Sequence, residues 1–152
     1  CRNEVGEVYN KNFKFLPGIH KELIKSKVNV IISSGPLIFN CSDAIKILKK
    51  KNIKAGLINV NSFKPFNFKL MEKLLKNKKN VLVVEDHVSQ GGLSGLVYET
   101  IAKSKMSKIN LKSLNLDEKF SESGNPHDLE KMNGFDSNNI AKTFYEKFKS
   151  AK

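Results

Sequence analysis

Three adjacent side chains, Glu85, Asp86 and His87, have the chemistry of a reactive site, because two carboxylates and an imidazole can transfer protons or bind a metal ion. They directly follow an apolar run, which places them at the end of a predicted strand. The other histidines, His20 and His127, are distant in sequence, so no cluster with metal-ligand spacing forms. Three roles for the triplet stay open: acid–base catalysis, a structural hydrogen bond, and contact with another domain. Contact with another domain is favoured over catalysis.

Three glycines, Gly91, Gly92 and Gly95, follow this triplet and predict a turn into a helix. Backbone amides at such a helix start can hold a phosphate, so a module that binds a phosphorylated ligand is one hypothesis. A dinucleotide is disfavoured, because the first glycine of G-x-G-x-x-G is missing and no acid ends the next strand. In the simpler interpretation, Gly91 and Gly92 form the turn and Gly95 lets the helix lie close to the sheet.

The remaining nucleophile signals are incomplete. Ser33, Ser34 and Ser94 stand in no G-x-S-x-G context. Cys41 precedes a predicted helix, where a thiolate is favoured, but we expect a small, partly buried side chain. We therefore predict no catalytic, cofactor-binding or metal-binding residue in this chain, and we expect the loop from residue 85 to residue 95 to face an interface or an active site.

The elements that position this loop follow from alternating apolar runs and helical periodicity, which predict parallel strands joined by right-handed crossovers. The prediction is a three-layer α/β/α sandwich whose mostly parallel sheet has about five strands, with functional loops at the strands' carboxyl ends. The expected strands are 28–33, 54–60, 80–86 and 108–114. The expected helices begin at residue 41 or 42, after Asn67, near Leu93, after Asn125, and after Asp136 or Ser137.

The N-terminal part is harder to interpret. Residues 1–27 are expected to be a lead-in with a short edge strand at Phe13–Phe15 and a helical turn or hairpin arm at Ile19–Lys25. Residues 28–150 then form the α/β domain, which makes the chain a single domain overall. The chain begins with Cys1 instead of Met, which suggests a piece of a longer protein.

Composition excludes several classes of protein. With 152 residues, 39% of them hydrophobic, the chain can bury one core. Its apolar runs are far shorter than the roughly 20 residues of a membrane helix, and two cysteines form no disulfide framework. No secretory signal is visible, so we expect a cytoplasmic protein without a membrane partner.

The net charge of +12 invites a nucleic-acid interpretation. Only one of the 27 basic residues, Arg2, is an arginine, the residue that suits bidentate phosphate and base contacts. The charge lies in residues 1–80, which hold 17 basic and 5 acidic residues. A solvated lysine-rich surface explains this bias, and we expect no nucleic-acid partner.

Four segments together carry a family resemblance. In chain order they read SFKPFN (62–67), VVEDHVSQGGLSGLVYE (83–99), FSESGNPHDL (120–129) and GFDSNNI (134–140). Their order and spacing resemble the C-terminal domain of the transketolase family of thiamine-diphosphate enzymes, over about residues 28–150. Two departures stand out: Asn67 replaces the family's aspartate, a swap that preserves helix capping, and no arginine beyond Arg2 is available for a substrate phosphate.

The resemblance implies a division of labour. Enzymes of this family transfer a two-carbon ketol unit between sugar phosphates, with thiamine diphosphate and Mg²⁺ held by a G-D-G motif in another domain. This chain contains no such motif, so the resemblance implies a non-catalytic domain, inactive alone, that packs on the N-terminal and pyrimidine-binding domains of the same or a separate chain and supports a homodimer. The equivalent domain of deoxyxylulose-phosphate synthase or of a 2-oxo acid dehydrogenase beta subunit is an alternative.

Overall fold

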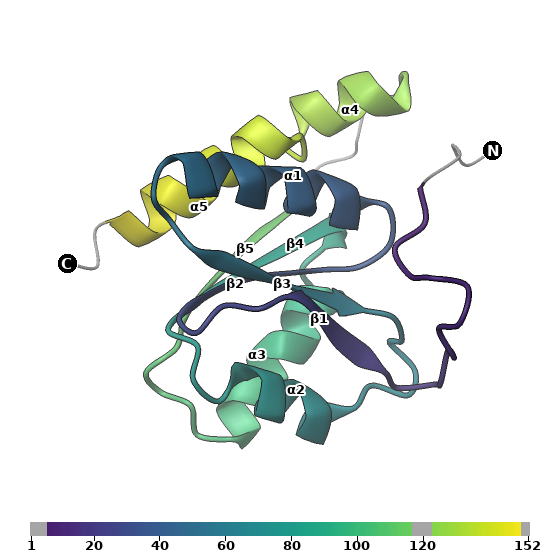
Figure 1. Ribbon diagram of the computed structural model, residues 1–152, viewed down its shortest axis with the longest axis vertical. Helices are drawn as coiled ribbons and strands as arrows, with labels where there is room; N and C mark the ends of the chain where they lie inside the picture. Colours follow the sequence, from purple (N-terminus) through teal and green to yellow (C-terminus); the bar gives the residue numbers. More distant parts are fainter. Residues whose placement is uncertain (1–5, 117–122, 150–152) are drawn as a thin grey trace.

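The computed structural model describes residues 6–116 and 123–149, which form a five-stranded sheet between two layers of helices (Figure 1). The strand order is β1-β3-β2-β4-β5, and only β1 runs antiparallel to its neighbour. The strands are β1 His20–Ile24, β2 Asn29–Ser33, β3 Ala55–Val60, β4 Asn80–Val88 and β5 Asn110–Leu116. The predicted α/β sandwich and its mostly parallel sheet are confirmed.

The helices are α1 Leu37–Lys50, α2 Phe68–Leu75, α3 Leu93–Lys103, α4 Pro126–Met132 and α5 Ser137–Lys149. Helices α1 and α5 cover one face of the sheet, and α2 and α3 cover the other (Figure 1). No helix in the described ranges is both long enough and apolar enough to cross a membrane.

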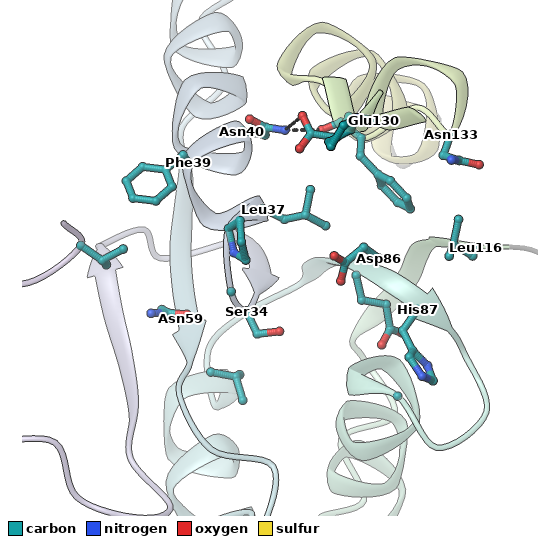
Figure 2. A pocket seen from close by; sticks show the side chains of 18 of the residues that line it. Ser34, Leu37, Phe39, Asn40, Asn59, Asp86, His87, Leu116, Glu130 and Asn133 are labelled. Atoms are coloured by element: carbon teal, nitrogen blue, oxygen red, sulfur yellow. Dashed lines mark hydrogen bonds between the residues drawn. The ribbon is translucent and has the colours of Figure 1, made fainter. Parts of the chain in front are cut away.

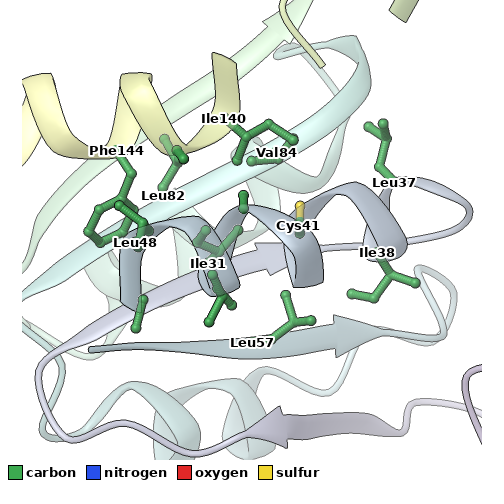
Figure 3. Close-up of a cluster of buried hydrophobic side chains, with 14 of the residues drawn as sticks. Ile31, Leu37, Ile38, Cys41, Leu48, Leu57, Leu82, Val84, Ile140 and Phe144 are labelled. Carbon is green, nitrogen blue, oxygen red and sulfur yellow. The ribbon is translucent and has the colours of Figure 1, made fainter. Parts of the chain in front are cut away.

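The central strands of the sheet are continuous apolar runs because helices cover both of its faces. Along β4, Leu82 and Val84 face the cluster under α1 and α5, whereas Val81 and Val83 face the cluster under α2 and α3. All four are fully buried, as expected for a parallel strand covered on both faces. Figure 3 shows the first cluster, where Phe144 of α5 closes over Leu48 and Leu82. Each such side chain contributes about 1.5–3 kcal/mol through burial.

Side-chain caps fix the starts of three helices as predicted. The Asn67 side chain accepts a hydrogen bond from the Leu70 amide at 2.9 Å, and Asn125 accepts one from the His127 amide at 3.0 Å. Asp136 accepts from the amides of Asn138 and Asn139. These caps satisfy amides that have no partner within the helix, which sets where each helix begins.

Two expectations about element limits are wrong. Helix α1 begins at Leu37, not at residue 41 or 42, because Pro36 supplies a helical φ of −61° directly before it and no side-chain cap is needed. Phe13–Phe15 is not a strand. The edge strand is β1, so the segment Ile19–Lys25 is extended instead of a helical turn, and it pairs with β3 instead of closing a local hairpin. Residues 1–5, 117–122 and 150–152 lie outside the described residues, and with them part of the FSESGNPHDL segment and the C-terminal limit, residue 150, of the predicted domain.

Candidate functional site

A broad groove of about 1490 Å³ lies along the carboxyl ends of the four parallel strands. Ser34, Asn61, Asp86 and Leu116 each lie in it, close to the ends of β2, β3, β4 and β5 respectively. The N-terminal segment around Tyr9 and helix α4 complete its walls (Figure 2). The sheet topology therefore brings together the loops that were expected to carry function.

Of the predicted triplet, Glu85 turns inward. Its side chain is 4% exposed, and its carboxylate accepts hydrogen bonds from the Leu93 amide at 2.5 Å, the Ser94 amide at 2.9 Å and the Ser94 hydroxyl. A carboxylate at a helix N-terminus satisfies otherwise unpaired amides and interacts favourably with the helix dipole. Glu85 thus joins β4 to the start of α3.

Asp86 and His87, by contrast, are exposed and line the groove (Figure 2). His87 Nδ1 lies 3.0 Å from the Val88 carbonyl oxygen. Neither side chain has the buried, oriented environment of an acid–base pair. The triplet therefore divides into one structural carboxylate and two groove-facing polar groups.

The glycines also divide by role. Gly91 has a φ of +74°, which a turn requires and glycine adopts without strain. Gly92 allows a close approach, because a Cβ there would lie 2.3 Å from Glu85 Oε2 and 2.6 Å from the Val88 carbonyl oxygen. A Cβ on Gly95 would meet the Ser89 carbonyl oxygen at 3.3 Å, so Gly95 faces this loop, not the sheet as expected.

The start of α3 is not open to a phosphate. The amides of Leu93 and Ser94 are both bonded to Glu85, and the Gly92 amide donates to the Ser89 carbonyl oxygen at 3.4 Å. A phosphate would have to displace a buried carboxylate from these donors. The geometry therefore argues against the phosphate-binding hypothesis based on the glycine turn.

A cluster of three polar side chains in the groove wall was not predicted from the sequence. The Tyr9 hydroxyl donates to Asn61 Oδ1 at 3.1 Å, while the Asn59 side-chain amide donates to Tyr9 and Asn61 at 2.9 Å each. These contacts hold the N-terminal segment across the end of β3. The only sequence signal is the pair of polar residues at the end of an apolar run.

Asn40 of α1 holds helix α4 over the groove. The side-chain amide of Asn40 donates to Glu130 Oε2 at 3.1 Å and to the Phe135 carbonyl oxygen at 3.0 Å (Figure 2). No α4 residue is buried, so this amide is a main link between α4 and the rest of the domain. Asn40 and Glu130 are 90 positions apart, which explains why the sequence gives no sign of the contact.

Charge distinguishes the groove from the rest of the surface. The charged residues among its described lining are Glu85, Asp86 and Glu130, and no lysine or arginine lines it in the part of the chain that the structure describes. The chain as a whole carries a net charge of +12. The groove is therefore an acidic to neutral patch on a basic molecule.

The other candidate residues lie elsewhere. Cys41 is not ahead of a helix but inside α1, fully buried, and burial raises the pKa of its thiol to about 12. His127 is exposed on α4, and His20 is buried at the start of β1. Within residues 6–116 and 123–149, no three His, Cys, Asp or Glu side chains converge in a way that could hold a metal ion.

Acid should weaken the fold through His20. Its Nε2 accepts a hydrogen bond from the Asn67 amide at 3.3 Å, and burial lowers its pKa below 6.5. The unfolded chain then binds a proton that the native chain excludes, so the free energy of unfolding falls as the pH drops below about 6.5. Urea unfolding at several pH values should show a flatter dependence for His20→Asn than for the wild type. The exposed control His127→Asn should keep the wild-type slope; equal slopes for all three proteins would contradict this prediction.

Comparison with known proteins gives one family match. The family model described as "Transketolase, C-terminal domain" matches residues 22–140. The chain is 27% identical over 146 residues to an apulose-4-phosphate transketolase subunit of Phocaeicola vulgatus, covering 95% of this chain and 46% of that protein. It is 33% identical over 133 residues to a "Putative transketolase C-terminal section" of Methanocaldococcus jannaschii, covering 87% and 40%.

A third relative is the "1-deoxy-D-xylulose-5-phosphate synthase" of Dictyoglomus thermophilum, 31% identical over 121 residues, covering 79% of this chain and 19% of that protein. Among solved structures, one titled "Split gene transketolase, inactive beta4 tetramer" superposes with a TM-score of 0.85 at 24% identity, covering 97% of this chain and 48% of that one. The transketolase of Campylobacter jejuni gives 0.66 at 18% identity, covering 91% and 20%. These structures show the same fold, and the chain spans less than half the length of these relatives.

Proposed function

Because the chain belongs to the transketolase C-terminal domain family, we propose that it is the C-terminal domain of a thiamine-diphosphate-dependent transketolase that transfers a two-carbon ketol unit between sugar phosphates. In this proposal the domain is not catalytic. It packs on the N-terminal and pyrimidine-binding domains, from the same chain or a separate one, and the complete enzyme is a cytoplasmic homodimer. The observation that carries the proposal is the family match over residues 22–140.

The geometry of the groove supports a partner role instead of a cofactor site. Thiamine diphosphate carries a diphosphate and is bound with Mg²⁺ in this family, so its site needs amides, cations and metal ligands. Here the amides at the start of α3 are filled by Glu85, and the described lining has carboxylates without lysine or arginine. The residues present do not fit the cofactor, and we place it in the other domains.

The extent of the matches does not separate a transketolase from the alternative synthase. The matches to the Phocaeicola transketolase and to the Methanocaldococcus section cover 95% and 87% of this chain. The match to the deoxyxylulose-phosphate synthase of Dictyoglomus covers 79%. Another deoxyxylulose-phosphate synthase matches 89% of this chain, more than the Methanocaldococcus section does, so the synthase domain stays the alternative within the proposal.

Complementation tests the proposal. The purified chain, supplied with thiamine diphosphate and Mg²⁺, should neither bind the cofactor in calorimetry nor transfer a ketol unit from a ketose phosphate to an aldose phosphate. Joined to, or mixed with, the two other domains encoded at its natural locus, it should restore transfer that those domains lack alone. Ketol transfer by the isolated chain would overturn the proposal, and so would full activity of the other domains without it.

A further inference from the structure

The groove offers hydrogen-bond acceptors and negative charge to whatever occupies it. Asp86 of β4 and Glu130 of α4 contribute carboxylates, and no lysine or arginine among the described lining residues neutralises them (Figure 2). The chain has 27 lysine and arginine residues, yet none lies among the described residues that line this groove. The charge of the groove therefore differs from that of the chain as a whole. An anionic occupant would be repelled, and a cationic one attracted.

One buried acceptor in the wall points the same way. Asn59 lines the groove and is 5% exposed, and its Oδ1 accepts no hydrogen bond within the described part of the chain. A buried carbonyl oxygen without a donor costs about 1–3 kcal/mol. Its amide nitrogen is already used by Tyr9 and Asn61, so the missing partner must be a donor.

Size and lining indicate a polypeptide occupant. At about 1490 Å³ the groove exceeds the roughly 300–1000 Å³ of small-molecule pockets. Between the polar groups its surface is apolar, formed by Val8, Leu37, Phe39, Phe63, Leu116 and Leu129. Phe63 remains 40% exposed, which leaves apolar area for a partner to cover.

We propose that this groove binds an apolar segment of the partner domain that presents a lysine or arginine side chain to Asp86 and Glu130. The inference rests on the proposed function, which supplies the partner, and adds the chemistry of the surface that docks. The apolar residues of the segment would cover Phe63 and Leu129, and the cation would lie between the two carboxylates. A second copy of this chain and a free sugar phosphate are the competing occupants.

Short blocked peptides test the inference on this chain alone. The probes are Leu-Arg-Phe, Leu-Gln-Phe and Leu-Glu-Phe, each acetylated and amidated, titrated into the ¹⁵N-labelled chain. We expect the arginine peptide to shift the amide signals of Gly35, Leu37 and Gly91 with a Kd of about 1 mM, and the glutamate peptide to leave them unchanged. Inorganic phosphate should not shift them either.

A matched pair of double variants isolates the two carboxylates. The double variant Asp86→Asn/Glu130→Gln should weaken binding of the arginine peptide by about tenfold, to the affinity of the glutamine peptide. Glu130→Gln keeps an oxygen acceptor for Asn40. The control Asp43→Asn with Glu72→Gln changes the net charge equally at exposed positions outside the groove, and binding should be unchanged.

Several outcomes would overturn the inference: equal binding of the arginine and glutamate peptides, equal weakening by both double variants, or no change at the groove amides of the wild type. Phosphate shifting the same amides would favour the sugar phosphate as occupant. Peptide-blocked self-association, seen by sedimentation of the free chain, would favour a second copy. Because no other domain is present, these results are independent of the complementation test.

Discussion

Glu85→Ala should lower the free energy of unfolding by about 3–5 kcal/mol, because it removes a buried charged acceptor and leaves several buried donors unpaired. The Leu93 and Ser94 amides and the Ser94 hydroxyl all donate to this carboxylate. Ser94 is fully buried, so its freed donors would not reach water in the native fold. Urea denaturation followed by circular dichroism measures the loss, and amide exchange should show α3 opening first.

Two control variants show whether the loss of stability in Glu85→Ala is specific to the Glu85 carboxylate. Glu85→Gln keeps one oxygen acceptor and turns a donor toward the other amide, so it should cost less, about 2 kcal/mol. Asp86→Ala, one residue along at an exposed position, should change stability by no more than about 0.5 kcal/mol. Equal effects at the two positions would show that Glu85 does not anchor α3.

Gly92→Ala should destabilise the chain by about 2–3 kcal/mol through overpacking. The added Cβ would lie 2.3 Å from Glu85 Oε2 and 2.6 Å from the Val88 carbonyl oxygen, so either the carboxylate or the end of β4 must move. Backbone strain plays no part, because the φ of Gly92 is −88°. The measurement is again the midpoint and slope of urea unfolding.

A double-mutant cycle that combines Gly92→Ala with Glu85→Ala separates this clash from a general effect of adding alanine. When Glu85 is already alanine, Gly92→Ala should cost about 1 kcal/mol less, because half of the steric conflict is gone. Gly95→Ala is the matched control: its Cβ would meet one carbonyl oxygen at 3.3 Å, and alanine's helix propensity offsets that contact by about 1 kcal/mol. Strict additivity in the cycle, or a Gly95 effect as large as that of Gly92, would contradict the proposed contact.

Local signals predicted most of the fold. The continuous apolar run of β4 required cover on both faces, and Asn67, Asn125 and Asp136 set helix starts through hydrogen bonds a few residues away. The start of α1 was misjudged because Pro36 replaces a side-chain cap by fixing φ, and a polar residue farther along looked like a better cap. A strand at Ile19–Lys25 was one of two open alternatives, but its antiparallel pairing with β3 was not predicted, because the partners lie 33 to 40 positions away, as His20 with Val60 and Ile24 with Leu57 show.

The candidate site was predictable in place but not in detail. Topology alone puts the loops after β2, β3 and β4 at one edge, and the groove lies there. The sequence cannot say that Glu85 turns inward while Asp86 turns outward, since that depends on where α3 begins relative to β4. The contacts of Asn40 with Glu130 and of Tyr9 with Asn61 join distant segments, so only the folded structure reveals them.

Lysines at the two borders of the sheet protect it from pairing with other chains. The outer strands β1 and β5 carry the exposed Lys21 and Lys112, and Lys147 of α5 donates to the Ser113 carbonyl oxygen at 3.0 Å, covering one hydrogen-bonding group of β5. Charged side chains along a border strand oppose the stacking that leads to fibrils. Part of the excess positive charge that invites a nucleic-acid interpretation therefore lies where it disfavours edge-to-edge pairing of sheets.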